Sequence, residues 1–414
     1  MSAAPVPWLH GESSDAQSTM SSTSPLVSRS IAIVRQSYNP FGGAERFVAR
    51  ALAALADQGL AITLVTRKWD SACHPDQRVL FRKPFYIGRL WRDASFARAA
   101  RETIAAENFD LVQSHERIPG CDIFRAGDGV HATWMEQRAR TLGPFMRLAQ
   151  KISPWHRYTV AAETAMFRHP GLRAVICNSD MVRSDIARRF PAIASKLHVI
   201  HNGVDMTRFN LGLRQEHRIA IRQQMGVSER TPVVVHVGSG FARKGVPQLI
   251  DAFRNPRLKD VELWLIGEDK HAARLAARAS NLGPRIRFLG GQQDVAPYLA
   301  AADLFALPTL YDPMPNAALE ALACGLPVLT SRSSGAAELI TSSSYGAVVD
   351  ALDVAAIAQE IARLLMGACD PRQVEAMRNA AFAAVAHLSS VDMAARQIAL
   401  YRGLLTEADK SRPL

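Results

Sequence analysis

Short apolar runs, each followed by a turn or a polar loop, recur along the chain and constrain its fold most strongly. The first two, at residues 31–34 and 62–65, flank an Ala/Leu/Phe-rich segment with helical periodicity. Neither run alternates between apolar and polar residues, which is typical of strands that are covered on both faces in a parallel sheet. Further runs lie in "FDLVQSH", "CDIFRAGD", "RAVICNS", "TPVVVHVGSG", "ELWLIGED", "IRFLGG", "DLFALPT", "LPVLTS" and "GAVVD". The sequence therefore predicts an α/β protein with doubly wound parallel sheets.

The pattern of strands and helices restarts after "LHVIHNGVDMTRFN", which predicts two Rossmann-like units in tandem. A length of 414 residues also favours two or three domains over one. The expected divisions are a disordered Ser/Ala/Pro-rich leader (1–29), an N-terminal unit (30–205), a C-terminal unit (206–390) and a C-terminal helix (391–408). The last Ala/Leu-rich segment, about Met377 to Leu405, is predicted to be helical and to cross back onto the first unit.

The chain is strongly basic, with a net charge of +11 and a pI of about 9.8. Such a surface attracts phosphates, nucleic acid or anionic lipid headgroups, and charge alone does not choose among them. No segment approaches the roughly 20 apolar residues of a spanning helix, so any membrane contact is expected to be peripheral. Five scattered cysteines without a C-x-x-C pair disfavour a zinc site and a disulfide framework and fit a reducing compartment.

Loops that follow the strands hold the candidate site residues, because open α/β sheets bind ligands outside the carboxyl ends of their strands. Gly42 and Gly43 follow the first strand and precede a helix, so backbone can approach a phosphate there, although a plain tight turn is the alternative. The loop that begins at Gly238 follows another strand and lacks the G-x-G-x-x-G spacing of a dinucleotide site. Its Arg243 and Lys244 could neutralise a diphosphate or be two solvated surface cations.

Two acids, Asp312 and Glu320, lie in "LYDPMPNAALEALACGLPVLTS". Asp312 precedes a proline, so we expect it in the loop after a strand. Pro315 favours a helix start and Gly325 a helix stop, which predicts a short helix of about Pro315–Cys324 with Glu320 little more than one turn inside. In a cleft, both carboxylates would accept hydrogen bonds from hydroxyl groups of a nucleotide sugar. A surface carboxylate that stabilises the helix start is the alternative.

Three further residues are weaker candidates. His115 ends the strand in "DLVQSH" and could donate to a sugar hydroxyl, while Asp122 and Asp128 in "GCDIFRAGDG" are possible acceptor-side carboxylates. A packing or surface role is the alternative for each. The chain contains no D-x-D triplet, the commonest clamp for a metal-bound nucleotide diphosphate. Cations and backbone amides, rather than a metal, are therefore expected to stabilise a departing diphosphate.

Four motifs together resemble family 4 of the retaining glycosyltransferases, which have the two-domain GT-B fold. They are "PFGGAERFV", "HVGSGFARKGV", "ADLFALPTLYDPMPNAALEALACGLPVLTS" and "GAAELI", in the family's order and approximate spacing. The resemblance runs from Ile31 to about residue 405. Within the family, "VGSGFARKGV" and "AGDGVHATWMEQRAR" are most similar to the lipopolysaccharide core glucosyltransferase I group. This implies transfer of glucose from UDP-glucose to an inner-core heptose by a peripheral enzyme on the cytoplasmic face of the inner membrane, without a metal or other cofactor.

The resemblance also implies roles for the two acids and the two cations. Arg243 and Lys244 would hold the diphosphate. Glu320 matches the second acid of the family's E-x7-E motif, which meets the ribose. Asp312 stands where relatives have a glutamate that meets the donor sugar, and its side chain is one methylene shorter.

The remaining implied contacts involve backbone or less specific positions. Gly42 and Gly43 would lie near the donor phosphates or the acceptor, and His115 near the donor sugar. Backbone amides of the loop that contains Pro315 would contact the donor. Pro315 itself has no N–H group, so the available amides are those of Met314, Asn316 and Ala317.

Other interpretations stay open at this point. The chain could be a family 4 enzyme with another donor and acceptor, such as a capsule, exopolysaccharide or O-antigen glycan. It could also be a sugar-nucleotide binding protein without transfer activity, or an epimerase on the same architecture. A nucleic-acid binder ranks last, because no recognised nucleic-acid module accompanies the basic residues. None of these patterns predicts an oligomeric state.

Overall fold

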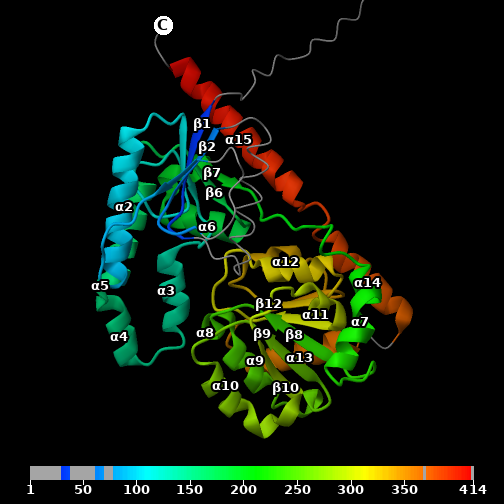
Figure 1. Cartoon of the computed structure of the whole chain (residues 1–414). Helices are drawn as coiled ribbons and strands as arrows, with labels where there is room; N and C mark the ends of the chain where they lie inside the picture. The colour runs from blue at the N-terminus through cyan, green and yellow to red at the C-terminus, as the bar shows by residue number, and fades with distance from the viewer. Residues whose placement is uncertain (1–28, 38–60, 70–77, 367–369, 412–414) are drawn as a thin grey trace, which may run out of the picture.

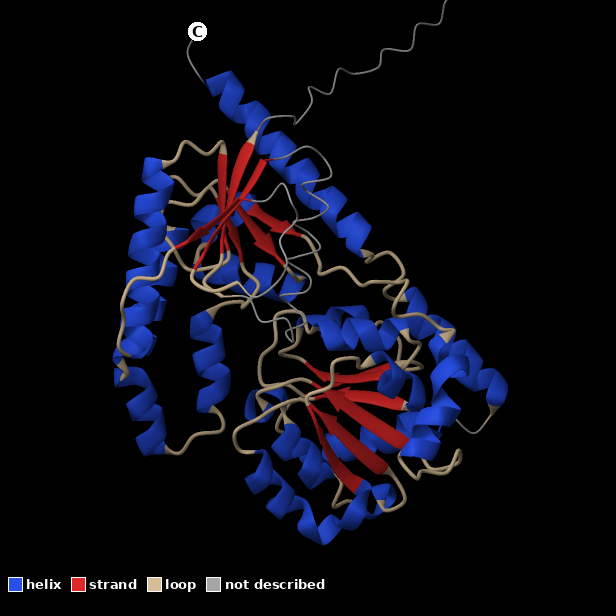
Figure 2. Cartoon of the chain, viewed as in Figure 1, coloured by secondary structure: helices blue, strands red, loops and turns tan. Residues whose placement is uncertain are grey.

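The computed structural model of the chain describes residues 29–37, 61–69, 78–366 and 370–411, and arranges them in two units that each contain a sheet (Figures 1 and 2). Gly42, Gly43, most of the expected leader and the first predicted helix lie outside the described residues. Helices flank both sheets (Figure 2). The prediction of two doubly wound parallel sheets is confirmed.

The N-terminal unit contains seven described strands, all parallel, in the order β3-β2-β1-β4-β5-β6-β7. The strands are β1 (Ser30–Val34), β2 (Ala61–Thr66), β3 (Arg78–Phe81), β4 (Leu111–Ser114), β5 (Ile123–Arg125), β6 (Ala174–Cys177) and β7 (Leu197–Val199). Its helices are α2 (Gly88–Ala106), α3 (His131–Ala139), α4 (Pro144–Ile152), α5 (Pro154–Phe167), α6 (Asp180–Arg189) and the 3-10 helix η1 (Pro191–Lys196).

The C-terminal unit contains six described strands, all parallel, in the order β10-β9-β8-β11-β12-β13. The strands are β8 (Val233–Val237), β9 (Glu262–Ile266), β10 (Ile286–Gly290), β11 (Leu304–Leu307), β12 (Val328–Ser331) and β13 (Gly346–Val349). Its α-helices are α7 (Leu213–Gln224), α8 (Phe241–Lys244), α9 (Val246–Ala252), α10 (Ala272–Ala279), α11 (Ala296–Ala301), α12 (Asn316–Ala323), α13 (Val354–Met366) and α14 (Pro371–Ala383). Three 3-10 helices complete it: η2 (Pro256–Leu258), η3 (Ser280–Arg285) and η4 (Gly335–Leu339).

Burial of β1 on both faces explains why its sequence does not alternate. Ile31 and Ile33 belong to a core cluster on one face of the first sheet, and Ala32 and Val34 belong to a cluster on the other. Successive side chains of a strand point to opposite faces, so both faces require apolar residues.

Two helices, rather than one, form the end of the chain. The helical segment predicted from Met377 to Leu405 is interrupted between α14 and α15 (Ser390–Ser411), so the prediction of one helical stretch is wrong. The physical reason is a backbone pairing in the break, where Val204 donates to the carbonyl of Leu388 (2.7 Å) and accepts from the amide of Ser390 (3.0 Å). Beyond the break, α15 packs on the N-terminal sheet (Figure 1).

Strand order locates the place where a ligand fits. Each sheet reverses its direction of winding at one strand pair, β1/β4 in the first sheet and β8/β11 in the second. In open α/β sheets, loops at such a switch point diverge and leave a crevice outside the carboxyl ends of the strands.

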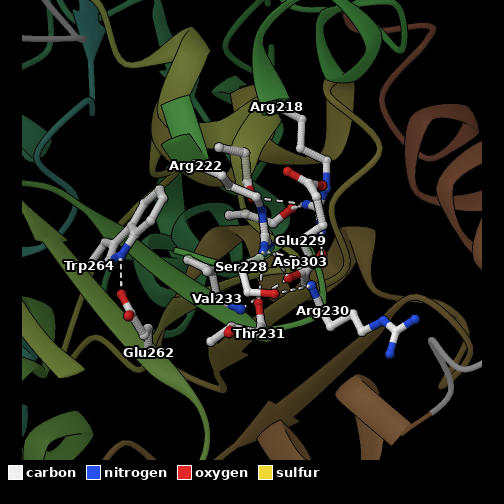
Figure 3. A network of polar contacts seen from close by, with 12 residues as sticks. Arg218, Arg222, Ser228, Glu229, Arg230, Thr231, Val233, Glu262, Trp264 and Asp303 are labelled. Atoms are coloured by element: carbon white, nitrogen blue, oxygen red, sulfur yellow. Dashed lines mark hydrogen bonds and ion pairs between the residues drawn. The ribbon is translucent and has the colours of Figure 1, made fainter. Parts of the chain in front are cut away.

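A buried arginine anchors the opposite, amino end of β11 (Figure 3). Arg222 of α7 is fully buried, and its guanidinium pairs with Asp303 at 2.6 Å. It also donates to the carbonyls of Ala301 (2.9 Å), Ser228 (2.7 Å) and Thr231 (2.8 Å), while Asp303 accepts from the Val233 amide at 3.0 Å. The network joins α7, β8 and β11 far from the carboxyl ends of the strands.

We predict that Arg222→Ala lowers the free energy of unfolding by about 3–5 kcal/mol. The Asp303 carboxylate loses its fully buried partner and keeps Arg218 (2.9 Å) and Arg214 (3.4 Å), while the carbonyls of Ser228 and Thr231 lose a donor. Urea denaturation measures the loss. Arg98→Ala is the matched control: this helical arginine also pairs with an acid, Glu102, but its side chain is 79% exposed. The control should cost about 0.5 kcal/mol or less. Equal costs for the two variants would contradict a structural role for the Arg222 network.

His236, in the middle of β8, gives the stability a pH dependence. Its ring is fully buried, and Nδ1 donates to the carbonyl of Ala306 at 3.0 Å. Burial, with a smaller contribution from the charge of Lys244, lowers the pKa of His236 from 6.5 to about 4, against the opposing effect of the hydrogen bond to Ala306. The unfolded chain therefore binds the proton more readily between pH 6.5 and 4, so this contribution to stability is complete above pH 6.5 and is lost as the pH falls towards 4.

We predict that His236→Asn removes about 2–3 kcal/mol of the fall in unfolding free energy between pH 7 and 4.5. The measurement is urea denaturation at both pH values, with His387→Asn, at an exposed position, as the control. A wild-type pH dependence in His236→Asn would show that His236 is not a source of the acid sensitivity.

Candidate active site between the two sheets

A cavity of about 900 Å³ lies between the two units, outside the carboxyl ends of both sets of strands. Loops after β1, β4, β5 and β6 line one wall, and loops after β8, β9, β10 and β11 line the other. Both switch points therefore open into the same space. Of the candidates from the sequence, ten line it: His115, Asp128, Gly238, Arg243, Lys244, Asp312, Met314, Asn316, Ala317 and Glu320.

A cluster of charges around the buried Asp312 connects the loop after β8 with the loop after β11. The Oδ2 atom of Asp312 accepts hydrogen bonds from the Lys244 ammonium and, at 3.3 Å, from Arg243. Arg243 also donates to the carbonyl of Tyr311 at 3.1 Å. The sequence placed these cations and this acid in one site but did not predict that they pair with each other.

Backbone contacts hold the same two loops together. The carbonyl oxygen of Arg243 accepts from the Leu310 amide (2.8 Å) and from the Thr309 hydroxyl (3.0 Å). Gly238 has a positive φ of 151°, and a Cβ added to it would lie 3.3 Å from Cε of Lys244. Glycine at this position lets the Lys244 side chain lie against the backbone and reach the aspartate.

Burial and ion pairing act in opposite directions on the acid. Burial alone would raise the pKa of Asp312, but the charges of Lys244 and Arg243 and their hydrogen bonds bring the pKa below its ordinary value of 3.8. Burial likewise lowers the pKa of Lys244, with Asp312 opposing the shift. Asp312 is therefore a carboxylate at neutral pH, and its charge is shared with two cations.

Helix α12 directs its first turn into the cavity. Pro315 is the residue before the helix and Cys324 the residue after it, so the helix predicted from residues 315 to 324 is confirmed to within one residue at each end. Asn202 from the segment between the units donates to the carbonyl of Met314 (3.2 Å) and to Oδ1 of Asn316 (2.7 Å), which fixes the start of α12. Glu320 lies one turn further along and also lines the cavity.

The amide groups at the start of α12 are a second source of positive potential. The first residues of any helix have no intrahelical acceptor for their amides, and the helix dipole adds about half a positive charge there. Asn316 and Ala317 occupy these positions and line the cavity. An anion in the cavity would thus meet the α12 amides from one side and the two cations from another.

His115 lines the opposite wall, after β4. Its Nδ1 lies 3.4 Å from Arg35, and its Nε2 lies 3.1 Å from the side-chain nitrogen of Gln113. Burial lowers the pKa of His115 well below its ordinary value of 6.5, and the charges of Arg35 and Arg125 add to the effect. His115 is therefore a neutral imidazole in this environment, suited to hydrogen bonding and not to carrying charge.

Asp122, unlike Asp128, does not line the cavity, which corrects its placement among the acceptor-side candidates. It precedes β5, at the amino end of that strand, and its carboxylate accepts from the Val112 amide at 2.8 Å. Its proximity to Asp128 in the sequence was misleading, because β5 separates the two and carries them to opposite ends of the sheet.

Several cavity residues were not predicted from the sequence. Arg35, Glu116, Arg117 and Asn178 directly follow strands, so the rule that located His115 could have found them. Other cavity residues lie on helices of the first unit and do not follow a strand, so that rule could not have found them. They are Arg89, Arg92, Trp134, Trp155 and Tyr158.

One group of described residues, Asp180, His201 and Glu338, brings metal-ligand atoms within 4.8 Å of one another. It lies outside the cavity. The Glu338 carboxylate accepts from the Asp180 amide (2.9 Å) and contacts Nε2 of His201 (2.5 Å), so it joins α6 and the segment after β7 to η4. We interpret the group as a contact between the units. The absence of a metal requirement stays a prediction.

Two family models match the chain, one in each unit. The model described as Glycosyltransferase Family 4 matches residues 41–208, and the model described as Glycosyl transferases group 1 matches residues 231–366. The cavity residues of the first wall fall within the first match, apart from Arg35 and Gln36, and those of the second wall fall within the second match.

Curated relatives and solved structures agree with these matches. The lipopolysaccharide glucosyltransferase WaaG of Escherichia coli is 27% identical over 77% of this chain and 84% of its own length. The lipopolysaccharide core biosynthesis glycosyltransferase LpsE of Rhizobium meliloti is 29% identical over 78% of this chain and 86% of its own. The crystal structure of WaaG superposes with a TM-score of 0.76 and 24% identity, covering 89% of this chain and 98% of WaaG. Anabaena HepE, solved with UDP-glucose, gives a TM-score of 0.65 and 21% identity over 90% and 98%.

Proposed function

The chain belongs to glycosyltransferase family 4 and has the GT-B fold, and from this premise we propose that it transfers glucose from UDP-glucose to a lipopolysaccharide-core acceptor with retention of anomeric configuration. One observation carries the proposal. Asp312, Arg243, Lys244 and the start of α12 converge at the carboxyl ends of β8 and β11, where a nucleotide sugar would meet cations, amides and a carboxylate together. The likeness to WaaG and LpsE supports the acceptor class, and the UDP-glucose bound by HepE supports the donor.

In this proposal, the diphosphate of the donor binds between the cations and α12. Arg243 and Lys244 donate charge-assisted hydrogen bonds to its oxygens, and the first amides of α12 donate from the other side. A dianionic diphosphate competes with Asp312 for the cations, which releases Asp312 to accept from a sugar hydroxyl. Glu320, one turn along α12, accepts from the ribose hydroxyls.

Transfer then proceeds without a protein nucleophile. The bond from the anomeric carbon to the diphosphate oxygen lengthens, and Arg243 and Lys244 stabilise the negative charge that develops on the leaving group. The acceptor hydroxyl attacks from the same face, and its proton passes to the departing diphosphate oxygen. The sugar thereby keeps its configuration.

The first wall of the cavity would hold and orient the acceptor. Neutral His115 lines this wall, and in the proposal it exchanges one of its contacts with Arg35 and Gln113 for a hydrogen bond to the donor sugar, without adding positive charge. Asp128, one of the carboxylates on this wall, would accept from an acceptor hydroxyl. Precise positioning of the two substrates contributes to the rate, and closure of the units around them excludes water.

The proposal extends to partners and location. A lipid-linked glycan acceptor would place the enzyme on the cytoplasmic face of the inner membrane as a peripheral protein, attracted by anionic lipid. Among the described helices, none has the length and apolar character needed to cross a bilayer. We propose no metal and no nucleic-acid partner.

A second candidate function is nucleotide-sugar binding without transfer, and a third is family 4 transfer with a different donor or glycan. The complete set of Arg243, Lys244 and Glu320 in one cavity favours an active enzyme over a binding protein. A panel of nucleotide sugars tested against truncated lipopolysaccharide acceptors, with products analysed by mass and linkage, separates the candidates.

We predict that Lys244→Ala lowers kcat/KM with UDP-glucose and a truncated lipopolysaccharide acceptor by about 10²–10³-fold, because one stabilising donor to the leaving group is lost. The measurement is the rate of UDP release together with product formation. Lys259→Ala, at an exposed position in the same unit, is the control and should keep wild-type activity.

Unfolding curves of both variants exclude a loss of folded protein as the cause. Wild-type turnover in a folded Lys244→Ala variant would refute the assigned role of Lys244. Absence of glucose transfer in the wild-type protein with every acceptor tested would refute the proposed function.

A further inference from the structure

Three polar side chains of the N-terminal unit form a hydrogen-bonded triad that ends at the first wall of the cavity. Nη1 of Arg138 lies 3.3 Å from Nε2 of His156, and Nδ1 of His156 lies 2.9 Å from Nε2 of His131. Both histidines are buried, and of the three residues His131 lines the cavity. The hydrogen bonds of this triad decide which nitrogen of His131 carries the proton.

The direction of each hydrogen bond follows from the arginine. A guanidinium group only donates, so Nε2 of His156 accepts from Arg138. Burial, together with the charges of Arg138 and Arg89, lowers the pKa of His156 below its ordinary value of 6.5, so the ring is neutral and carries its proton on Nδ1. That Nδ1–H group donates to Nε2 of His131. His131 then carries its own proton on Nδ1.

His131 is also neutral and is held in one orientation. Burial and the charge of Arg117 lower the pKa of His131 from 6.5 to about 3. The backbone amide of His131 donates to the carboxylate of Glu163 at 2.9 Å, and Glu163 pairs with Arg117 at 2.9 Å. The ring of His131 meets the ring of Trp155 edge to face, with centroids 5.3 Å apart. The side chain of His131 is therefore fixed on the cavity wall as a neutral ring with a defined tautomer.

The Nδ1–H group of His131 is available to a ligand. Nδ1 has no hydrogen-bond partner among the described residues, and it is not one of the fully buried polar atoms, so it is accessible from the cavity that His131 lines. Its neighbours on this wall are Asp128, three residues earlier, and the aromatic residues Trp134, Trp155 and Tyr158. A carboxylate accepts hydrogen bonds, whereas a neutral Nδ1–H group donates them, so the wall offers both kinds of partner to the oxygens of a sugar.

We infer that His131 binds the glycan acceptor by donating from Nδ1 to one of its oxygens, and that Arg138 and His156 are positioning residues that keep the proton on this nitrogen. In a free neutral imidazole side chain the Nε2–H tautomer predominates, so the opposite tautomer has to be imposed by the triad. The identity of the ligand as a glycan acceptor rests on the proposed function, whereas the tautomer does not.

The tautomer is measured on the full chain without donor or acceptor. Correlation spectra between ring protons and ring nitrogens of ¹⁵N-histidine-labelled protein distinguish a protonated nitrogen from an unprotonated one, and His131→Leu identifies the signals of His131. At neutral pH we expect the proton of His131 on Nδ1 in the wild type and partly on Nε2 in Arg138→Met. Arg138→Lys, which still donates and cannot accept, should keep the wild-type tautomer. A proton on Nε2 of His131 in the wild type would overturn the inference.

Kinetics with UDP-glucose and a truncated lipopolysaccharide acceptor test the contact itself. His131→Leu should raise KM for the acceptor about tenfold, and Arg138→Met, which leaves His131 in place, about threefold, with KM for UDP-glucose within about twofold of the wild type in both. His131→Asn, whose amide can donate from near the position of Nδ1, should recover part of the loss. Arg157→Met is the matched control, at an exposed position on the same helix as His156, and should behave like the wild type.

Folded His131→Leu and Arg138→Met variants with an unchanged acceptor KM, or with equal rises in KM for donor and acceptor, would overturn the inference. Titration of the acceptor into the labelled protein gives a readout that needs no turnover, because a hydrogen bond to the ligand should shift the Nδ1 signal of His131. A shift without any transfer by the wild type would support the inference and refute the proposed function. No shift, with or without transfer, would overturn the inference.

Discussion

The interaction on which the candidate site depends is the pairing of the buried Asp312 with Lys244 and Arg243. These residues are 68 and 69 positions apart and meet because β8 and β11 are neighbours at the switch point of the second sheet. The pairing fixes the loop after β8 against the loop after β11, and α12 starts directly from the second loop. Cations, carboxylate and helix amides therefore reach the same cavity from three short segments, and the geometry of each depends on the others.

The same pairing constrains the chemistry. The two cations keep the pKa of Asp312 below its ordinary value despite burial, so Asp312 is ionised. An ionised carboxylate accepts hydrogen bonds from hydroxyl groups, which is the role that the proposal gives Asp312. In the proposed mechanism, the diphosphate replaces Asp312 as the partner of the cations, so the leaving group itself supplies both the charge to be stabilised and the base.

The sequence predicted much of this arrangement, for identifiable reasons. Uninterrupted apolar runs located the strands, and Pro315 and Gly325 defined α12, because these signals are local. The pairing of Asp312 with the two cations depends on which strands are neighbours, so spacing along the chain could not give it. The break before α15 depends on pairing with Val204, which is far away in the sequence. Trp155 lines the cavity from a helix, so the search for residues that follow strands could not find it. The placement predicted for Asp122 was wrong because Asp122 precedes β5 and Asp128 follows it, so the two residues lie at opposite ends of the sheet.

The two units contribute differently to the proposed reaction: the second carries the charges that stabilise the leaving group of the donor, and the first carries the cavity wall that receives the acceptor. The most direct test of the central claim is the anomeric configuration of the product, measured by proton NMR after transfer from UDP-glucose, in which glucose is α-linked. A leaving diphosphate that acts as the base on the same face predicts an α-linked product. A β-linked product would require attack from the opposite face with a separate protein base, and would contradict the account.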